Sequence, residues 1–356
     1  MHLDNGKIPE DYLRYTHKKL CWIIGGIVTL FFLLIISISL GAVSIPPIEV
    51  IMTLLGQNPG TKADSIIWHA RLPQALTAIV AGAGLSVAGV AMQSILRNPL
   101  ASPFTLGISN AGAFGAAFAI IFLGTGTLTS TTAGAVIINN PYLTTISAFV
   151  FCMLATIAII AIAKIKASSP EVVILSGVAL SSLFTAGVMF LQYFSDDSQL
   201  AAVVHWTFGD VGRAGWPEFW LMSFVTFAAC IYFILNRWNY NAMDAGDETA
   251  KGLGVNVDKL RNAGMIVAAL VTAILVSFLG VIGFVGLVCP HMVRRIIGDE
   301  QRYLIPGSIV MGSLLLLASD TVARLIMAPY VLPVAILTSF LGAPVFIYLL
   351  IKGYHR

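Results

Sequence analysis

Long stretches without Asp, Glu, Lys or Arg divide this sequence into apolar segments joined by short polar ones. A helix rises about 1.5 Å per residue, so roughly 20 apolar residues cross the ~30 Å hydrocarbon layer of a membrane. Most of the runs therefore predict single membrane-spanning helices. The charge-free runs are 20–48, 72–96, 98–163, 172–195, 219–236, 262–293, 303–319 and 325–351.

Two of these runs are too long for one crossing. The run 98–163 contains the polar stretch "GTGTLTSTTAGAVIINNP", which cannot lie in lipid as irregular backbone, so two spans are predicted there. The run 262–293 contains Gly280, Gly283, Gly286 and Pro290. These residues mark either a kink in one span or a return across the membrane.

The placement of basic residues decides between nine and ten crossings. With ten, only Lys62, Arg71, Arg213 and Arg324 of the 20 Lys and Arg residues lie outside, which agrees with the excess of positive charge on cytoplasmic loops. Nine crossings would move five basic residues outward. We expect an all-α polytopic membrane protein with ten transmembrane helices. Residues 1–19 form a cytoplasmic segment, 20–354 the membrane domain, and both ends are cytoplasmic.

Composition supports a cell-membrane location. The chain is 58% hydrophobic with a mean hydropathy of +0.89, which is more apolar surface than a soluble domain of 356 residues could bury. The apolar run Leu20 to Ile48 is too long for a signal-peptide core, so it is expected to stay as the first span. The cysteines have no CxxC spacing and are predicted to be small core residues rather than disulfide or metal partners. They are Cys21, Cys152, Cys230 and Cys289.

Catalytic and ion-coupling motifs are missing from the sequence. No GxxxxGK[ST], HExxH or GxSxG pattern occurs, which argues against an enzyme and against ATP binding by this chain. The runs offer no mid-membrane charge for a coupling ion; Asp320 is the nearest exception, and Arg324 one turn later could pair with it. His69 and His205 are too few for a metal site. A stand-alone secondary transporter or channel is the alternative to a transporter driven by a partner.

One cytoplasmic loop is unusually charged. The stretch "AMDAGDETAKGLGVN" (242–256) carries Asp244, Asp247, Glu248 and Lys251 in a chain that is only 10% charged. Its pattern predicts one or two short helices separated by a break at Gly252–Gly254, within a loop spanning 237–261. Such a loop is either a solvated connector or a docking surface for a cytoplasmic partner.

Four long motifs occur in order along the chain. They begin "RLPQALTAIVAGAGLSVAGVAMQ" (Arg71), "GDETAKGLGV" (Gly246), "GFVGLVCPHMVRRIIGDEQRYLIP" (Gly283) and "LPVAILTSFLGAPVFIYLL" (Leu332). Together they resemble the type II ABC importer permeases of the FecCD type, which import vitamin B12, ferric siderophores, haem and some oxyanions. The resemblance covers about residues 20–354.

The resemblance implies a fold and a set of partners. It implies the type II ABC importer permease fold, a homodimer, two cytoplasmic ATPase subunits that hold ATP and Mg, and an extracytoplasmic substrate-binding protein. No cofactor on this chain and no nucleic acid is expected. The cargo stays open among iron-siderophore, haem, cobalamin and molybdate or tungstate, with an iron complex or cobalamin favoured.

The resemblance also assigns residues. It places the ATPase-coupling helices on the charged loop, at Gly246, Asp247, Glu248, Thr249, Ala250, Gly252, Leu253 and Gly254. It makes Arg71 and Arg324 docking residues for Glu side chains of the binding protein, although each could instead be an interfacial anchor. Many relatives carry a second Arg where this chain has Gln74, so Gln74 is left out of the docking set.

The translocation path is sketched by small polar residues. The stretch "KIKASSPEVV" (164–173) predicts the end of one span and a new helix with Ser169 as N-cap and Pro170 at its first position. Resemblance to the vitamin B12 permease places Ser168 and Ser169 at the cytoplasmic gate, although capping alone also explains Ser169. Small polar residues on the following helix either line the path or pack helices. They are Ser176, Ser181, Ser182 and Thr185.

Two further segments carry expectations. The small residues of 81–89 predict close helix packing in the middle of the subunit. The segment Ser195–Pro217 is expected outside the membrane, with a short amphipathic helix.

Overall fold

The computed structural model describes residues 10–57, 60–127, 137–138, 140–165, 169–327 and 330–353, and these residues are almost entirely helical. The only strands among them are the two-residue antiparallel pair β1 (Gly126–Thr127) and β2 (Ile137–Ile138). The helices are α1 (Glu10–Ser39), α2 (Pro47–Leu54), α3 (Lys62–Ile66), η2 (Ile67–Arg71), α4 (Leu72–Ile95), α5 (Ile108–Ile121), α6 (Pro141–Ile165), α7 (Pro170–Tyr193), α8 (Asp197–Thr207), η3 (Val211–Arg213), α9 (Trp216–Leu235), α10 (Arg237–Asp244), α11 (Asp247–Gly252), α12 (Val257–Leu279), α13 (Val285–Ile297), α14 (Gln301–Leu325) and α15 (Val334–Gly353).

Seven helices in the described ranges are long and apolar enough to cross a membrane. They are α1, the continuous stretch from α3 through η2 to α4, then α6, α7, α9, α12 and α14. Two shorter apolar helices, α5 and α15, lie beside them. The run 262–293 forms two helices, α12 and α13, separated at Gly280 to Phe284, which is what the ten-crossing expectation requires of it. Most of the polar stretch predicted to divide the run 98–163 lies outside the described residues.

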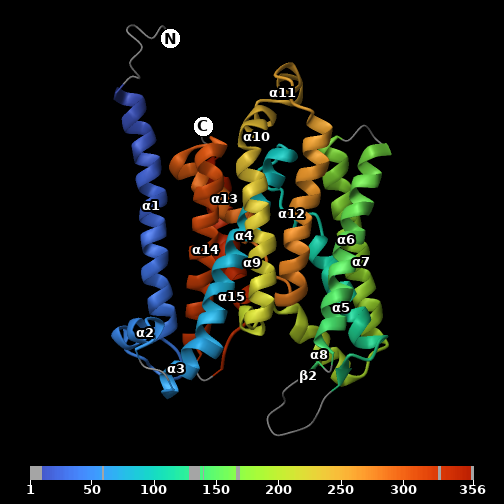
Figure 1. Ribbon diagram of the computed structural model, residues 1–356. Coiled ribbons are helices and arrows are strands. Elements are labelled where there is room, and N and C mark those ends of the chain that lie inside the picture. Colours follow the sequence, from blue (N-terminus) through green and yellow to red (C-terminus); the bar gives the residue numbers. More distant parts are fainter. Residues whose placement is uncertain are drawn as a thin grey trace.

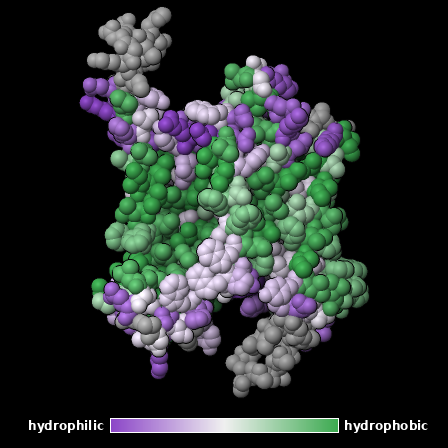
Figure 2. Space-filling model, in the orientation of Figure 1, coloured by the Kyte–Doolittle hydropathy of each residue, from purple (hydrophilic) through white to green (hydrophobic). Residues whose placement is uncertain are grey.

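The molecule has two polar ends and an apolar middle. Helices α10 and α11 lie at one end, together with the start of α1 and the end of α15, while α2, α3 and α8 lie at the other (Figure 1). We call these the α11 end and the α8 end. Hydrophilic residues gather at both ends of the visible face, and hydrophobic ones form a broad band between them (Figure 2). This distribution fits a multi-pass membrane protein.

Helix α4 is the centre of the bundle. It packs against α14, α12, α9 and α13, and most of its side chains are buried. A Cβ at Gly82 would overlap the backbone carbonyl of Gly312, and a Cβ at Gly89 would overlap that of Gly286. The prediction that residues 81–89 serve close helix packing is therefore confirmed, because only glycine lets these backbones touch.

Two smaller expectations have different outcomes. The short helix predicted within 195–217 is present as α8, which begins after Asp196 as its N-cap. Hydrogen bonds from Ser198 and Gln199 lower the pKa of the Asp196 carboxyl. The cysteine prediction is wrong for Cys21, which is exposed on α1, whereas Cys152 and Cys289 are buried. Cys21 lies beside an open groove between α1 and α14, so its apolar sequence neighbours did not imply burial.

Candidate functional site

The charged loop forms a projection at the α11 end of the molecule (Figure 1). It contains two short helices, as predicted, but they are separated at Ala245–Gly246 rather than at Gly252–Gly254. Gly246 has φ 117°, a conformation that side chains oppose, so it can turn the chain sharply between α10 and α11. The predicted break at Gly252–Gly254 instead ends α11, with Gly254 at φ 84°.

The loop has a buried face and an exposed crest. Tyr240, Met243 and Ala250 are almost fully buried against the bundle. Leu253 is 70% exposed, and the Glu248 side chain is 89% exposed. The crest therefore presents one large apolar side chain and one carboxylate on a base that packing holds in place, which is the composition of a docking surface.

Asp247 and Glu248 have the same predicted role, but their carboxylates have different partners. A carboxylate oxygen of Asp247 accepts a hydrogen bond of 2.7 Å from the Arg261 guanidinium, and Arg261 is only 3% exposed. Glu248 instead accepts a 2.9 Å hydrogen bond from Lys251 on the surface, and this bond raises the pKa of Lys251. Asp247 thus fixes α11 to α12, whereas Glu248 remains available to a partner.

Gln301, the first residue of α14, ties α10 to two membrane helices. Its side-chain amide donates to Ser94 Oγ of α4 at 2.7 Å and to Asp244 Oδ2 at 2.8 Å. Its backbone N–H donates to Asn241 Oδ1 at 2.9 Å. A parallel link joins α4 to α13, where Arg294 donates to Gln93 Oε1 at 2.8 Å. Direct hydrogen bonds therefore join the loop to α4, α12 and α14.

The Gln301 link gives a direct prediction. Gln301→Ala leaves Ser94 and Asp244 without their shared donor. We expect the free energy of unfolding to fall by about 1–3 kcal/mol and backbone hydrogen exchange in α10 and α11 to become faster. Exchange mass spectrometry of the purified protein measures this, with the surface variant Gln57→Ala as control. Unchanged exchange across residues 237–252 would show that Gln301 does not hold the loop.

The residues predicted for the path are divided between packing and surface. Ser169 Oγ accepts from the backbone N–H of Val172 at 3.4 Å, so its predicted capping role at α7 is confirmed; Ser168 lies outside the described residues. Asn110 of α5 donates to Ser181 Oγ at 2.6 Å and lies 3.5 Å from Thr185 Oγ1. Ser176 is buried and Ser182 is exposed. A cavity of about 200 Å³ opens beside Asn110, Thr185 and Gln192, and apolar side chains complete its lining.

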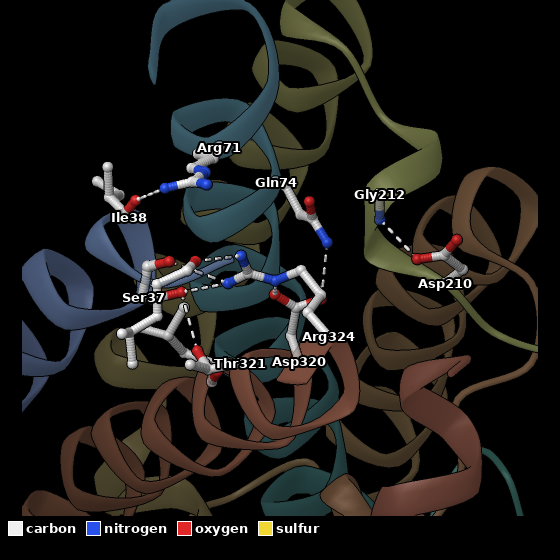
Figure 3. A network of polar contacts seen from close by, with 11 residues as sticks. Ser37, Ile38, Arg71, Gln74, Asp210, Gly212, Asp320, Thr321 and Arg324 are labelled. Atoms are coloured by element: carbon white, nitrogen blue, oxygen red, sulfur yellow. Dashed lines mark hydrogen bonds and ion pairs between the residues drawn. The ribbon is translucent and has the colours of Figure 1, made fainter. Parts of the chain in front are cut away.

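The arginines predicted for docking lie in a polar network at the α8 end (Figure 3). Arg71 is 8% exposed, and its guanidinium donates to the carbonyls of Ile38 at 2.6 Å, Ser39 at 3.2 Å and Val43. Pro73, lacking an N–H, follows the π-helical turn η2 that carries Arg71 toward α1. Arg71 thus caps the end of α1, where a positive charge also suits the helix dipole.

Arg324 completes the network from α14. Its Nε donates to Asp320 Oδ2 at 3.0 Å, which confirms the predicted pair, and it also donates to Ser37 Oγ at 2.7 Å. Gln74 donates to the other Asp320 oxygen at 2.9 Å. Asp320 is 2% exposed, so a buried carboxylate is held by two donors from different helices.

This network changes the meaning of the predicted residues. Neither guanidinium reaches out as an interfacial anchor, because both are occupied by the end of α1. Ser37 and Gln74, which the sequence did not select, are part of the same arrangement. The sequence signal of Ser37 was only a polar side chain inside an apolar run, whereas Gln74 also stands where many relatives carry a second Arg. In the described ranges, no three His, Cys, Asp or Glu side chains gather as a metal-binding set.

Comparisons with known proteins cover nearly the whole chain. The model of the FecCD transport family matches residues 29–352. The ABC transporter permease protein MJ0087 of Methanocaldococcus jannaschii is 52% identical over 98% of this chain and 99% of its own length. The hemin transport system permease protein HmuU of Yersinia pestis is 33% identical over 90% of this chain and 93% of its own. A solved inward-facing conformation of a metal-chelate type ABC transporter matches 93% of this chain and 98% of its own, with 29% identity and a TM-score of 0.79.

Proposed function

Because the chain belongs to the FecCD transport family, whose members are transport permeases and not enzymes, we propose that it is the transmembrane permease subunit of an ATP-binding-cassette importer. Its cargo is a metal chelate, namely an iron-siderophore, haem or cobalamin, delivered by a substrate-binding protein. ATP is hydrolysed by separate ATPase subunits. The cargo class rests on the relatives, whose printed names include hemin, Fe(3+)-citrate and vitamin B12.

The observation that carries this proposal is the anchored loop at the α11 end. Glu248 and Leu253 stand on its exposed crest, while the Asp247–Arg261 pair and Gln301 fix its base to α12, α4 and α14. A solvated connector has no need of such links. A lever that carries motion from an ATPase into the membrane needs both a docking crest and a rigid base.

We propose that two copies of the chain form the transporter, with the α11 end toward the cytoplasm and ten crossings per copy. The exposed face of α7 supports the pairing, because Ser182 and Thr185 lie there among exposed apolar side chains such as Leu183 and Met189. Small polar residues on an open helix face suit a helix interface or a water-lined path better than lipid. Two α7 faces meeting at the dimer axis would enclose such a path, with Ser168 and Ser169 at its cytoplasmic gate.

The α8 end then receives the substrate-binding protein. Arg71 and Arg324 stay the proposed docking residues, because they lie at that end on adjoining elements and can bind carboxylates. In this structure both arginines donate hydrogen bonds to the end of α1. Docking through them would replace these bonds with hydrogen bonds to carboxylates of the partner. The network would then couple arrival of the binding protein to the position of α1.

The stand-alone transporter is the weaker alternative. Such a protein needs an ionisable group that can bind and release a coupling ion within the membrane. Asp320 is the buried carboxylate near the membrane in the described helices, and Arg324 and Gln74 already occupy it. The network therefore favours an importer driven from outside the chain.

Co-expression tests the proposal. The chain is produced with the P-loop ATPase encoded beside its gene, solubilised and purified through a tag on the permease. We expect a complex of two permeases and two ATPases, measured by native mass spectrometry. A permease that purifies alone under conditions that preserve other ABC complexes would contradict the importer assignment and favour the stand-alone transporter.

A further inference from the structure

A groove of about 530 Å³ lies between α1 and the helices α13 and α14, toward the α11 end. Cys21, Trp22 and Gly25 line it from α1, and Ile297 and Met311 line it from the other side. Its volume falls within the range of about 300–1,000 Å³ seen for ligand sites. The α1 side of the molecule in Figure 2 is hydrophobic along its middle and hydrophilic at the α11 end. The groove therefore opens toward lipid.

Two adjacent glycines explain why the groove exists. A Cβ at Gly26 would lie 2.7 Å from Val310 Cγ1, so α1 touches α14 there. A Cβ at Gly25 would meet nothing within 4 Å, so the space beside it is open. The one hydroxyl on this stripe is that of Thr29. Its Oγ1 donates to the Gly25 carbonyl at 2.8 Å, so it needs no hydrogen bond from a bound molecule. The interior of the groove suits an apolar chain.

An exposed basic residue lies one helical turn beyond the groove on α1. Lys18 lies one turn before Cys21 and Trp22, on the same stripe of α1, and is exposed. No ion pair of Lys18 occurs in the described part of the chain. Its neighbour Lys19 is different, since it pairs with Glu300 at 3.5 Å and lies over the Tyr15 and Tyr303 rings. Lys18 is thus an exposed cation one helical turn from the apolar groove.

We propose that this groove binds one anionic membrane lipid from the leaflet on the α11 side. Its apolar tail lies beside Gly25 between α1 and α14, and its phosphate contacts Lys18. Basic sites between transmembrane helices on the cytoplasmic side bind anionic headgroups, and each buried methylene of a tail adds to the affinity. Trp22 at the mouth suits the headgroup depth. This proposal needs only a membrane-embedded chain and is independent of the ATPase role.

Retained lipid tests the proposal directly. The protein is expressed, washed in mild detergent and examined by native mass spectrometry, followed by lipid analysis of the released molecule. We expect one phosphate-bearing lipid on the wild type. Gly25→Leu, which fills the open space, should lose it, and Lys18→Glu should retain at least about fivefold less, the weight of one basic residue at a charged surface. Ile27→Leu and Lys164→Glu are the matched controls and should retain it.

Cys21 supplies a second readout in intact protein. It is the exposed one of the four free cysteines and lines the groove. In nanodiscs of phosphatidylcholine, adding phosphatidylglycerol should slow maleimide labelling of Cys21 at least about fivefold in the wild type. The labelling rate of Cys21 in Lys18→Glu should not change. Equal labelling in both membranes would overturn the proposal. So would a wild type that carries no lipid, lipid that Gly25→Leu and Lys18→Glu retain fully, or a protein chain held in the groove instead.

Discussion

Replacing Leu253 with Asp is expected to remove the ATPase from the purified transporter. Leu253 is 70% exposed on the crest of the loop and contributes nothing to the buried face, so the permease itself should fold and insert normally. A large apolar side chain at the centre of an interface contributes about 2 kcal/mol or more, and a buried carboxylate would add a desolvation cost. We expect binding of the ATPase to weaken at least about thirtyfold, since 1.4 kcal/mol corresponds to tenfold.

The control uses another exposed leucine at the same end. Leu13→Asp introduces the same change on α1, which lies apart from α11 (Figure 1), and should leave ATPase recovery unchanged. Recovery is measured by pull-down at several salt concentrations, with thermal unfolding of the permease alone as a check on folding. If Leu253→Asp retains the ATPase as well as Leu13→Asp does, the crest is not the docking surface and the loop is a connector.

Replacing Arg324 with Ala is expected to be the most destabilising change among the charged residues of the α8 end. Asp320 is 2% exposed, and Arg324 is its charged partner at 3.0 Å. Removing one member of a buried pair costs about 3–5 kcal/mol because the other charge stays buried without it. Replacing both Asp320 and Arg324 with Leu should cost less than Arg324→Ala alone, since no charge is then stranded.

Arg14 offers a matched comparison. It pairs with Glu10 at the same four-residue helical spacing, but at 3.9 Å and with both side chains largely exposed. Arg14→Ala should therefore change the free energy of unfolding by less than about 1 kcal/mol. Denaturant unfolding in mixed micelles gives both values. An Arg324→Ala loss as small as that of Arg14→Ala would show that the network does not hold α1 to α14.

The same residues allow docking to be separated from folding. Arg71→Glu should lower stimulation by the binding protein whether Arg71 docks or only caps α1. A binding protein with Lys in place of the facing Glu should restore stimulation only if Arg71 docks, because a partner cannot repair a lost cap on α1. Rescue supports direct docking, and failure of rescue in a folded variant assigns Arg71 to the structural network alone.

Much of the fold could be predicted because lipid imposes a strong pattern on sequence. Charge-free runs located the long helices, and the glycines of 262–293 marked the division into α12 and α13. The small residues of 81–89 predicted the close contacts at Gly82 and Gly89, because backbones that touch leave no room for a side chain. Helix ends were predicted less well. The charged loop offered glycines at 246, 252 and 254, and the sequence did not show that the turn between α10 and α11 would be at Gly246.

The site was predicted in outline and missed in its contacts. The loop was recognised from local charge and from its resemblance to relatives, yet nothing local distinguishes Asp247 from Glu248. Their difference depends on Arg261, 14 residues after Asp247, and the bond that fixes Asp244 comes from Gln301 on another helix. The Arg71 network depends on the end of α1, more than 25 residues earlier. Such long-range partners are determined by how the helices pack, which cannot be predicted from a single sequence.

ATP hydrolysis in liposomes tests the central claim most directly. The permease is reconstituted with its neighbouring ATPase, and hydrolysis is measured with the binding protein loaded with ferric siderophore, haem or cobalamin, or left empty. We expect one loaded binding protein to stimulate hydrolysis and to drive uptake of its cargo, with both effects lost in Leu253→Asp. Cargo uptake that proceeds without any ATPase, or hydrolysis that no loaded binding protein changes, would contradict a coupled importer.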